Sequence, residues 1–312
     1  MTRTTQAVRF DQYGDRGVLY VADVPTPEPG PGPGEVVVEV RAAGINPFDA
    51  TIRSGVIRHL FPVDFPSGQG SDLAGVVVAV GAEVGQLGVG DEVLGWTPAA
   101  GAHATHLAVM AERLVAKPPR VSWEAAGSLH MVGATAYAAA RAVAARPGET
   151  VAVSAAAGGV GSFLVQLLTH RGVRVLGIAS TDNAEWLEKH GVIPVPYGDG
   201  LRERLEQAAG AGGIDAFIDL YGPEYLDLAV ALGIKPDRIQ TTVAMERAAE
   251  IGARTDGRHS ATAREILVEL VDLVASGAVE IPIAATYPLD RVADAFAELE
   301  QRHTHGKIVL LP

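Results

Sequence analysis

The feature that most constrains the fold is an apolar segment that runs into a glycine cluster and continues as a second apolar segment. Val151–Leu168 has the sequence VAVSAAAGGVGSFLVQLL, and three of the four residues Gly158–Gly161 are glycine. Thr150–Ser154 has the length and apolar content of a buried strand, and Val160–Arg171 is typical of a helix with an apolar face. This succession predicts a βα unit, so we expect a sheet that is covered by helices.

The alternation of strand and helix continues after this turn. Strands are predicted at Arg174–Ile178, Val192–Val195, Ile214–Leu220 and Arg238–Val243, and helices at Asp182–His190, Leu201–Ala209 and Glu224–Leu232. Repeated βα units of this size predict a parallel, doubly wound sheet. Before the turn, Ser122–Ala145 is expected to be one helix, because Ser122 is a good N-cap and Pro147-Gly148 would end the run.

The N-terminal third has a different pattern of short apolar runs separated by glycines. They lie at Ala7–Phe10, Val18–Asp23, Glu35–Ala43, Gly75–Val80, Glu92–Gly95 and His106–Val109, with a Pro/Gly connector at Pro25–Gly34. Closely spaced strands without long helices between them favour an antiparallel or barrel-like domain that ends near Pro118-Pro119.

The C-terminal tail combines both types of element and is expected to pack back on the first domain. It contains predicted helices at Ala261–Ser276 and Leu289–Arg302 and predicted strands at Ile281–Thr286 and Lys307–Leu311.

Composition excludes several classes of protein. A chain of 312 residues is long enough for about two domains. It has no cysteine, so disulfides, thiolate zinc sites and cysteine nucleophiles are ruled out. The net charge of −12 disfavours nucleic acid as a partner. The absence of cysteine also fits a cytoplasmic protein. We expect neither a membrane span nor a secretory signal, because no apolar run is long enough.

The glycine turn is suited to binding a dinucleotide. A pyrophosphate needs backbone N–H donors at close range, and the N-terminus of a helix adds roughly half a positive charge. A lone glycine motif is weak evidence, but here a strand precedes it, a helix follows it, and a βαβ unit is completed. The alternative is an ordinary glycine turn in a sheet that binds no ligand.

The end of the second strand should distinguish NAD from NADP, because an acidic residue there binds ribose hydroxyls and polar or basic residues suit a 2′-phosphate. Ser180, Thr181 and Asn183 can donate hydrogen bonds to a phosphate, whereas Asp182 opposes one. The alternative for Asp182 is that it points away as a helix cap. The sequence leaves this choice open.

Several ordered motifs along the whole chain resemble those of the medium-chain dehydrogenases/reductases, and specifically their zinc-free quinone oxidoreductase (zeta-crystallin-like) branch. They are Ala43–Asp49 with Arg53 and Gly55, Gly70–Val77, Gly90–Val93, Thr135–Tyr137, Ala156–Gly161 and His305–Leu310. One departure is Ala155, which replaces a more usual glycine.

The resemblance implies an α/β protein with a GroES-like β-barrel domain (residues 1–121 and 279–312) and a Rossmann dinucleotide-binding domain with a doubly wound parallel sheet (residues 122–278). It implies NADPH-dependent reduction of quinones or α,β-unsaturated carbonyls in an interdomain cleft, with NADH as the alternative cofactor. A homodimer formed by edge strands of the cofactor domain is also implied. Zinc-dependent relatives carry Cys and a His-Glu pair where this chain has Asn46 and Ser71-Asp72, so no metal is expected.

The same resemblance assigns roles to individual positions. Asn46 would approach the nicotinamide and the substrate, and Asn46 and Tyr221 are the candidate catalytic residues. Asn183 stands where many relatives carry lysine, which leaves the NADP preference in doubt. The candidate cofactor-binding residues are Asn46, Thr135, Ala157, Gly158, Gly159, Val160, Gly161, Ser180, Asn183, Tyr197, Leu220, Tyr221, Thr241, Thr242 and Val243.

Several of these residues also have a purely structural explanation. Asn46 would satisfy a buried turn, Asp49 and Arg53 would form an i, i+4 pair, and Asp72 would be a buried hydrogen-bonding residue. Tyr197 would cover core rather than contact adenine. For the proton donor, Asn46, Tyr221, His130 and water remain open.

Three functions remain possible on the sequence alone: a general quinone or enone reductase, a dinucleotide-binding redox sensor or scaffold with little turnover, and a pathway-specific enoyl reductase.

Overall fold

The computed structural model describes residues 4–27, 33–98 and 100–312. Residues 28–32 of the expected Pro/Gly connector and the first three residues of the chain lie outside the described residues. The chain divides into two compact units. The first consists of Met1–Met131, Leu267–Ala275 and Ile283–Pro312, and the second of Val132–Ile266 and Ser276–Pro282.

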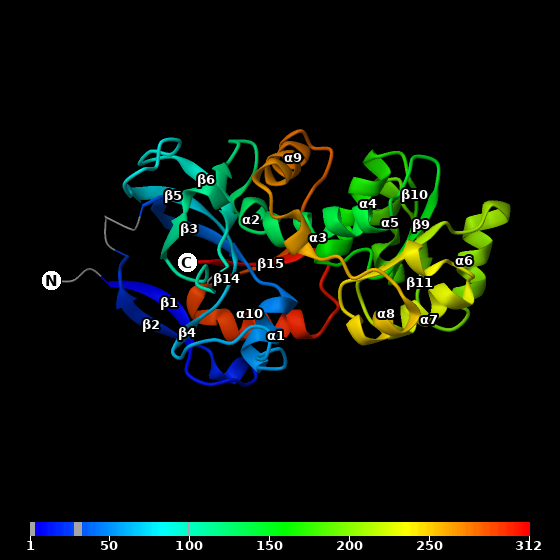
Figure 1. Ribbon diagram of the computed structural model, residues 1–312, viewed down its shortest axis with the longest axis horizontal. Coiled ribbons are helices and arrows are strands. Elements are labelled where there is room, and N and C mark those ends of the chain that lie inside the picture. The colour runs from blue at the N-terminus through cyan, green and yellow to red at the C-terminus, as the bar shows by residue number, and fades with distance from the viewer. Residues whose placement is uncertain (1–3, 28–32, 99) are drawn as a thin grey trace. The chain divides into compact units, whose positions relative to one another are not determined.

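The second unit is built on a parallel five-stranded sheet with the order β11-β10-β9-β12-β13. This confirms the predicted doubly wound parallel sheet. Figure 1 labels β9, β10 and β11 of this sheet. The order reverses between β9 and β12, and ligands of such sheets bind at the carboxyl ends of the strands at that point. The strands are β9 (Thr150–Val153), β10 (Arg174–Ala179), β11 (Ile193–Pro196), β12 (Ala216–Asp219) and β13 (Ile239–Thr241).

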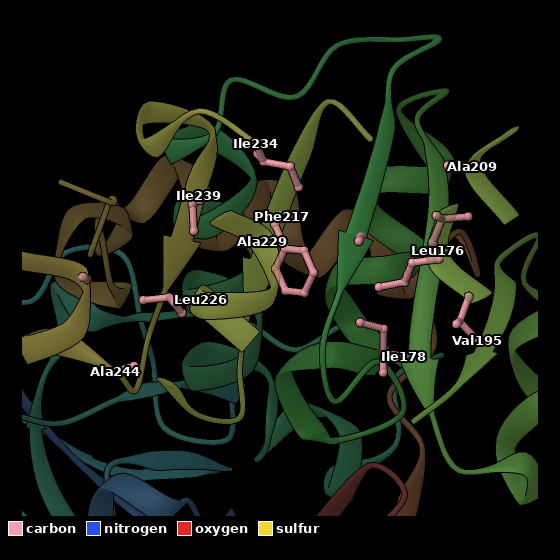
Figure 2. Close-up of a cluster of buried hydrophobic side chains, with 13 residues drawn as sticks. Leu176, Ile178, Val195, Ala209, Phe217, Leu226, Ala229, Ile234, Ile239 and Ala244 are labelled. Atoms are coloured by element: carbon pink, nitrogen blue, oxygen red, sulfur yellow. The ribbon is translucent and has the colours of Figure 1, made fainter. Parts of the chain in front are cut away.

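Four helices connect these strands: α4 (Gly159–His170), α5 (Ala184–Lys189), α6 (Leu201–Ala209) and α7 (Pro223–Ala231). A fifth, α8 (Met245–Ile251), follows β13. Figure 2 shows the apolar cluster between the sheet and some of these helices, in which Phe217 of β12 lies among side chains such as Leu176, Leu226 and Ile239. Burial of this cluster fixes the strands whose ends form the site described below.

The first unit consists mainly of antiparallel strands, as predicted. One sheet has the order β2-β1-β4, and the other has the order β14-β15-β3-β5-β6-β8, with β7 paired to β3. The strands are β1 (Thr4–Phe10), β2 (Tyr20–Pro25), β3 (Glu35–Gly44), β4 (Ser67–Gly68), β5 (Asp72–Val80), β6 (Glu92–Trp96), β7 (His106–Met110), β8 (Leu114–Ala116), β14 (Ile283–Pro288) and β15 (Lys307–Leu311).

The C-terminal strand returns to this first unit, as expected. In the antiparallel pairing of β15 with β3, Val309 is opposite Gly44 and Leu310 is opposite Ala43. The helix α10 (Val292–Glu300) packs beside β15, and its buried Phe296 belongs to the same apolar cluster as Ile308. The pairing brings Lys307, the first residue of β15, close to residues that follow β3.

The prediction of a single helix over Ser122–Ala145 is wrong. The structure has α2 (Trp123–Ala126) and α3 (Leu129–Ala142), separated at Gly127. The backbone N–H of Gly44 donates to the carbonyl of Gly127 at 2.7 Å, and a Cβ on Gly127 would lie 2.4 Å from the carbonyl oxygen of Ala42. The break therefore allows a close backbone approach that helix propensity does not reveal.

Other predicted helices start later than expected, because a short 3-10 turn precedes each α-helix. The helix predicted at Asp182–His190 is α5, the one predicted at Ala261–Ser276 is α9 (Arg264–Ala275), and the one predicted at Leu289–Arg302 is α10. The helix α1 (Pro47–Ser54) was not predicted, although proline at its first position and Gly55 with φ +77° at its C-terminus are typical helix boundaries. No helix within the described ranges is both long and apolar enough to cross a bilayer.

Candidate active site

The glycine turn connects β9 to α4 through a tight backbone. Ala155 adopts φ +48°, a left-handed conformation that favours glycine, which explains why glycine is more usual there. A Cβ on Gly161 would lie only 2.0 Å from the carbonyl oxygen of Ala155, so position 161 tolerates no side chain. The first N–H groups of α4 have no acceptor within the helix, and an N-terminus of this kind is suited to binding an anion.

Asp219, at the end of β12, is the central residue at the carboxyl edge of the sheet, where the parallel strands end. The sequence analysis did not identify it. Its Oδ1 accepts hydrogen bonds from Ser154 Oγ at 2.8 Å and from the backbone N–H groups of Tyr221 and Gly222 at 2.9 and 3.2 Å. Its Oδ2 accepts from Thr241 Oγ1 at 2.7 Å. Burial raises the pKa of this carboxyl, and its hydrogen bonds oppose the rise. Asp219 thus connects the ends of β9, β12 and β13.

This network brings together the predicted residues at the ends of the later strands. The backbone N–H of Leu220 donates to Ser154 Oγ at 2.8 Å, and that of Thr242 donates to the carbonyl of Asp219 at 3.2 Å. The Thr241 hydroxyl donates to Asp219 and accepts from the N–H groups of Val243 and Ala244, both at 3.1 Å. The Thr241 side chain therefore supports the loop.

Ser180 and Asn183 also lie together, after β10. Asn183 Nδ2 donates to Ser180 Oγ at 2.8 Å. Asp182 is exposed within the 3-10 turn Thr181–Asn183, whose N-cap residue is Ser180. The alternative that Asp182 is a helix cap is therefore wrong.

Tyrosine side chains are grouped on the same unit. Tyr197 is 49% exposed, which contradicts the alternative that it covers core. Tyr221 is 38% exposed, and its ring makes an edge contact with Tyr225 at 5.6 Å between centroids. Burial, with the nearby charge of Glu224, raises the pKa of Tyr225 to about 12. Thr135, by contrast, lies buried in α3.

The first unit holds a separate cluster around Asn46, which precedes α1. Asn46 is buried, and its Nδ2 donates to Asp72 Oδ2 at 3.2 Å. Its backbone N–H donates to Asp49 Oδ2 at 2.9 Å. Asp72 also accepts from the backbone N–H of Met131 at 3.0 Å, as expected for a buried hydrogen-bonding residue.

Lys307 completes this cluster, and the sequence interpretation gave it no role. Its Nζ donates to Asn46 Oδ1 at 2.5 Å and to the carbonyl of Ile45 at 2.6 Å. Only 4% of Lys307 is exposed. The signal available in the sequence was the lysine of the His305–Leu310 motif, but nothing in its spacing indicates contact with a residue 261 positions earlier.

His130 lies on the other side of Asp72. Its Nδ1 is 3.8 Å from Asp72 Oδ1, and its ring stacks on Trp96 at 4.8 Å with an interplanar angle of 7°. Within the described ranges, neither ring nitrogen has a hydrogen-bond partner, and the side chain is buried. A buried, unsatisfied imidazole beside a carboxylate is often found at functional sites.

Arg53 forms an ion pair with Glu300 of α10. Its Nη2 donates to Glu300 Oε1 at 2.7 Å, and its guanidinium lies 4.8 Å from the ring centre of Phe296. The described part of the chain contains no group of three or more His, Cys, Asp or Glu side chains that could hold a metal ion.

Comparisons with known proteins agree with this geometry. The family model "Alcohol dehydrogenase GroES-like domain" matches residues 32–119, and the model "Zinc-binding dehydrogenase" matches residues 190–310. A quinone oxidoreductase of Pseudomonas aeruginosa is 32% identical in an alignment of 327 residues that covers 98% of this chain and 99% of that protein.

The chain belongs to the zinc-free quinone oxidoreductase branch of the medium-chain dehydrogenase/reductase superfamily.

Solved structures of this branch have the same fold. The quinone oxidoreductase of Coxiella burnetii is 28% identical, with a TM-score of 0.86 over 99% of this chain and 100% of that one. The Escherichia coli quinone oxidoreductase complexed with NADPH is 26% identical, with a TM-score of 0.84 over 98% and 100%. These matches confirm the predicted GroES-like and Rossmann domains. The protein is therefore an NAD(P)H-dependent oxidoreductase.

Proposed function

We propose that this protein catalyses NADPH-dependent, zinc-independent reduction of quinones or α,β-unsaturated carbonyls. The observation that carries the proposal is the glycine turn beside the Ser154–Asp219 contact, at the point where the strand order of the parallel sheet reverses. The names of the relatives support the substrate class, because they include quinone oxidoreductases and one complex with NADPH.

The second unit is assigned cofactor binding. The turn formed by Ala157, Gly158, Gly159, Val160 and Gly161 would hold the pyrophosphate through backbone N–H groups. When bound, the dinucleotide supplies the hydride.

Other residues would contact the rest of the cofactor. Ser180 and Asn183 would donate to the 2′-phosphate, and Tyr197, half exposed, would contact the adenine. Leu220, Tyr221, Thr242 and Val243 would line the carboxyl edge, with Thr241 holding their loop through its hydroxyl. Asn46 and Thr135 are assigned to the nicotinamide end by family resemblance.

We assign to the first unit the binding of the substrate oxygen. Reduction of an enone or quinone by hydride leaves negative charge on oxygen, and a fixed N–H donor stabilises that charge. Asn46 is the proposed donor, because its amide is already held by Asp72 in a buried setting. Tyr221 is the second proposed catalytic residue, as the donor of the proton.

We also propose a homodimer, through the edge of the cofactor sheet. The edge strand β13 is already covered by Arg254, whose N–H donates to Ile239 at 2.8 Å and whose carbonyl accepts from Thr241 at 3.0 Å. The dimer would therefore form through the segment around Arg254. Light scattering after gel filtration measures this: a mass close to that of one chain would contradict it.

The experiment that tests the proposed function is a paired titration with NADPH and NADH, followed by rates of cofactor oxidation with a small panel of quinones and enones. We expect tighter binding of NADPH and turnover of several panel members. Binding without turnover would favour a dinucleotide-binding sensor, and turnover of one enone alone would favour a pathway-specific enoyl reductase. Tighter binding of NADH would make the NADP assignment wrong.

A further inference from the structure

We infer that Lys307 is a positioning residue that fixes the Asn46 side-chain amide, so that Asn46 acts toward the substrate only as a hydrogen-bond donor. The inference rests on the proposed function, because it concerns the group that would face the substrate oxygen. It adds a residue from the last strand of the chain to the site.

The orientation of the Asn46 amide follows from its two neighbours. Oδ1 accepts from the Lys307 ammonium at 2.5 Å, and Nδ2 donates to the Asp72 carboxylate at 3.2 Å. If the amide were rotated by half a turn, its NH2 group would face the lysine, a pure donor, and its oxygen would face a carboxylate, a pure acceptor. Both contacts would be repulsive, so only one orientation is compatible with this environment.

Lys307 is held independently of Asn46. Its Nζ also donates to the carbonyl of Ile45 at 2.6 Å, and its backbone is opposite Ile283 in the parallel pairing of β15 with β14. Burial lowers the pKa of Lys307, while the charges of Asp72 and Asp49 oppose that shift. The lysine therefore lies in a buried site that contains compensating carboxylates, where its hydrogen bonds are stronger than in water.

This arrangement restricts the substrate class. A side-chain amide has one acceptor oxygen and two N–H groups. The oxygen is directed at the Lys307 ammonium and one N–H at the Asp72 carboxylate, so we propose that the remaining N–H is the group that Asn46 offers to a ligand. That N–H pairs with a carbonyl or quinone oxygen. An alcohol hydroxyl would have to donate to the second lone pair of an amide oxygen that already faces a buried ammonium, which makes that oxygen a weak acceptor.

The test compares Lys307→Met with Lys117→Met. Lys117 is a suitable control because it is also buried in the first unit, where it pairs with Glu92 at 3.0 Å. Loss of one preorganised donor typically lowers kcat by about 100-fold or more, so loss of its positioning should lower kcat by about 10- to 100-fold. We expect that loss in Lys307→Met with unchanged NADPH affinity, and wild-type kcat in Lys117→Met.

A double-mutant cycle separates positioning from a general structural role. If Lys307 acts through Asn46, Lys307→Met should cause no further loss of kcat in a protein that already carries Asn46→Ala. Equal losses in both backgrounds would overturn the inference. The midpoint of urea unfolding, measured in parallel, reports any structural effect separately.

A spectroscopic readout makes the inference independent of turnover. The chain contains only two asparagines, Asn46 and Asn183, so selective [15N]asparagine labelling gives two pairs of side-chain N–H signals, one pair for each residue. We expect the Asn46 amide protons to exchange slowly in the wild type and in Lys117→Met, and faster with shifted signals in Lys307→Met. Unchanged Asn46 signals in Lys307→Met would overturn the inference.

The two proposals fail in different ways. If no quinone or enone is reduced, the proposed function is wrong, while the Asn46 signals still decide whether Lys307 fixes the amide. If Lys307→Met does not fold, the inference is tested by comparing the exchange rates of the Asn46 and Asn183 side-chain amide protons in the wild-type protein. Slower exchange at Asn46 than at the half-buried Asn183 supports the inference, and equal exchange at both overturns it.

Discussion

Ser154 Oγ donates a hydrogen bond of 2.8 Å to Asp219 Oδ1 and accepts another of 2.8 Å from the backbone N–H of Leu220. One hydroxyl thus connects the carboxyl ends of β9 and β12, between which the strand order reverses. The loop that follows Asp219 and the glycine turn that follows Ser154 are positioned by the same contact.

Replacement of Ser154 by alanine should weaken both stability and cofactor binding. It leaves the Leu220 N–H without its acceptor, and a buried unsatisfied group costs about 1–3 kcal/mol. We expect the free energy of unfolding in urea to fall by that amount and the Kd for NADPH to rise. Ser128→Ala is the control, because the buried Ser128 hydroxyl has no hydrogen-bond partner in the described ranges. Equal stability losses in both variants would refute this role.

Replacement of Gly161 by alanine should abolish dinucleotide binding. The new Cβ would lie 2.0 Å from the carbonyl oxygen of Ala155, so the turn must change shape. Fluorescence titration with NADPH and NADH measures the effect, and we expect at least about 100-fold weaker binding, a loss of about 2.8 kcal/mol. Gly212→Ala is the control, since no atom lies within 4 Å of its added Cβ. Near-normal affinity in Gly161→Ala would remove the turn from the site.

Replacement of Asn183 by lysine should increase the preference for NADPH. Asn183 is adjacent to Ser180, where the 2′-phosphate is proposed to bind, and a lysine would add a charge-assisted hydrogen bond. We expect a rise of about 3- to 10-fold in the ratio of NADH to NADPH dissociation constants, decreasing as salt is added. Gln207→Lys, which adds the same charge on α6, should leave the ratio unchanged. An unaltered ratio in Asn183→Lys would place the phosphate elsewhere.

The stability of the protein should decrease as the pH falls below neutrality, because of His103. Burial lowers the pKa of this imidazole to about 4, while its hydrogen bond to Gly44 and the charge of Asp72 oppose the shift and Lys307 adds to it. The ordinary value is 6.5, so between the two values the unfolded chain binds the extra proton. The free energy of unfolding should therefore fall as the pH drops through this window, by at most about 1.4 kcal/mol per pH unit.

His103→Gln tests this dependence, because glutamine does not titrate and can still donate to the Gly44 carbonyl. Urea unfolding between about pH 5 and pH 6.5, above the range where most carboxylates titrate, should show a smaller pH dependence in the variant. Identical slopes for the variant and the wild type would mean that His103 does not contribute.

Much of the cofactor unit could be predicted from the sequence because its signals are local. The strands β9 and β10 and the helix α4 each follow from an apolar run bounded by glycine or polar residues. The break at Gly127 could not be predicted, because it depends on backbone contact with Ala42 and Gly44 of another element.

The same distinction holds for the site. Gly161 and Asn183 were identified by motif position, whereas Asp219 and Lys307 were missed. Asp219 is a single acidic residue at the end of an apolar strand, and its four donors come from three separate strand ends. Lys307 reaches Asn46 only because β15 pairs with β3. Functional importance that depends on long-range pairing leaves little trace in local sequence.

The most direct test of the central claim is the position of the transferred hydride. The enzyme is incubated with NADPH deuterated at C4 and a simple enone, in separate reactions for the two C4 epimers, and the product is examined by mass spectrometry and NMR. We predict one deuterium at the β-carbon, from one epimer only, with a solvent proton at the α-carbon and the carbonyl retained. Deuterium on the carbonyl carbon, giving an alcohol, or no transfer from either epimer, would contradict the account.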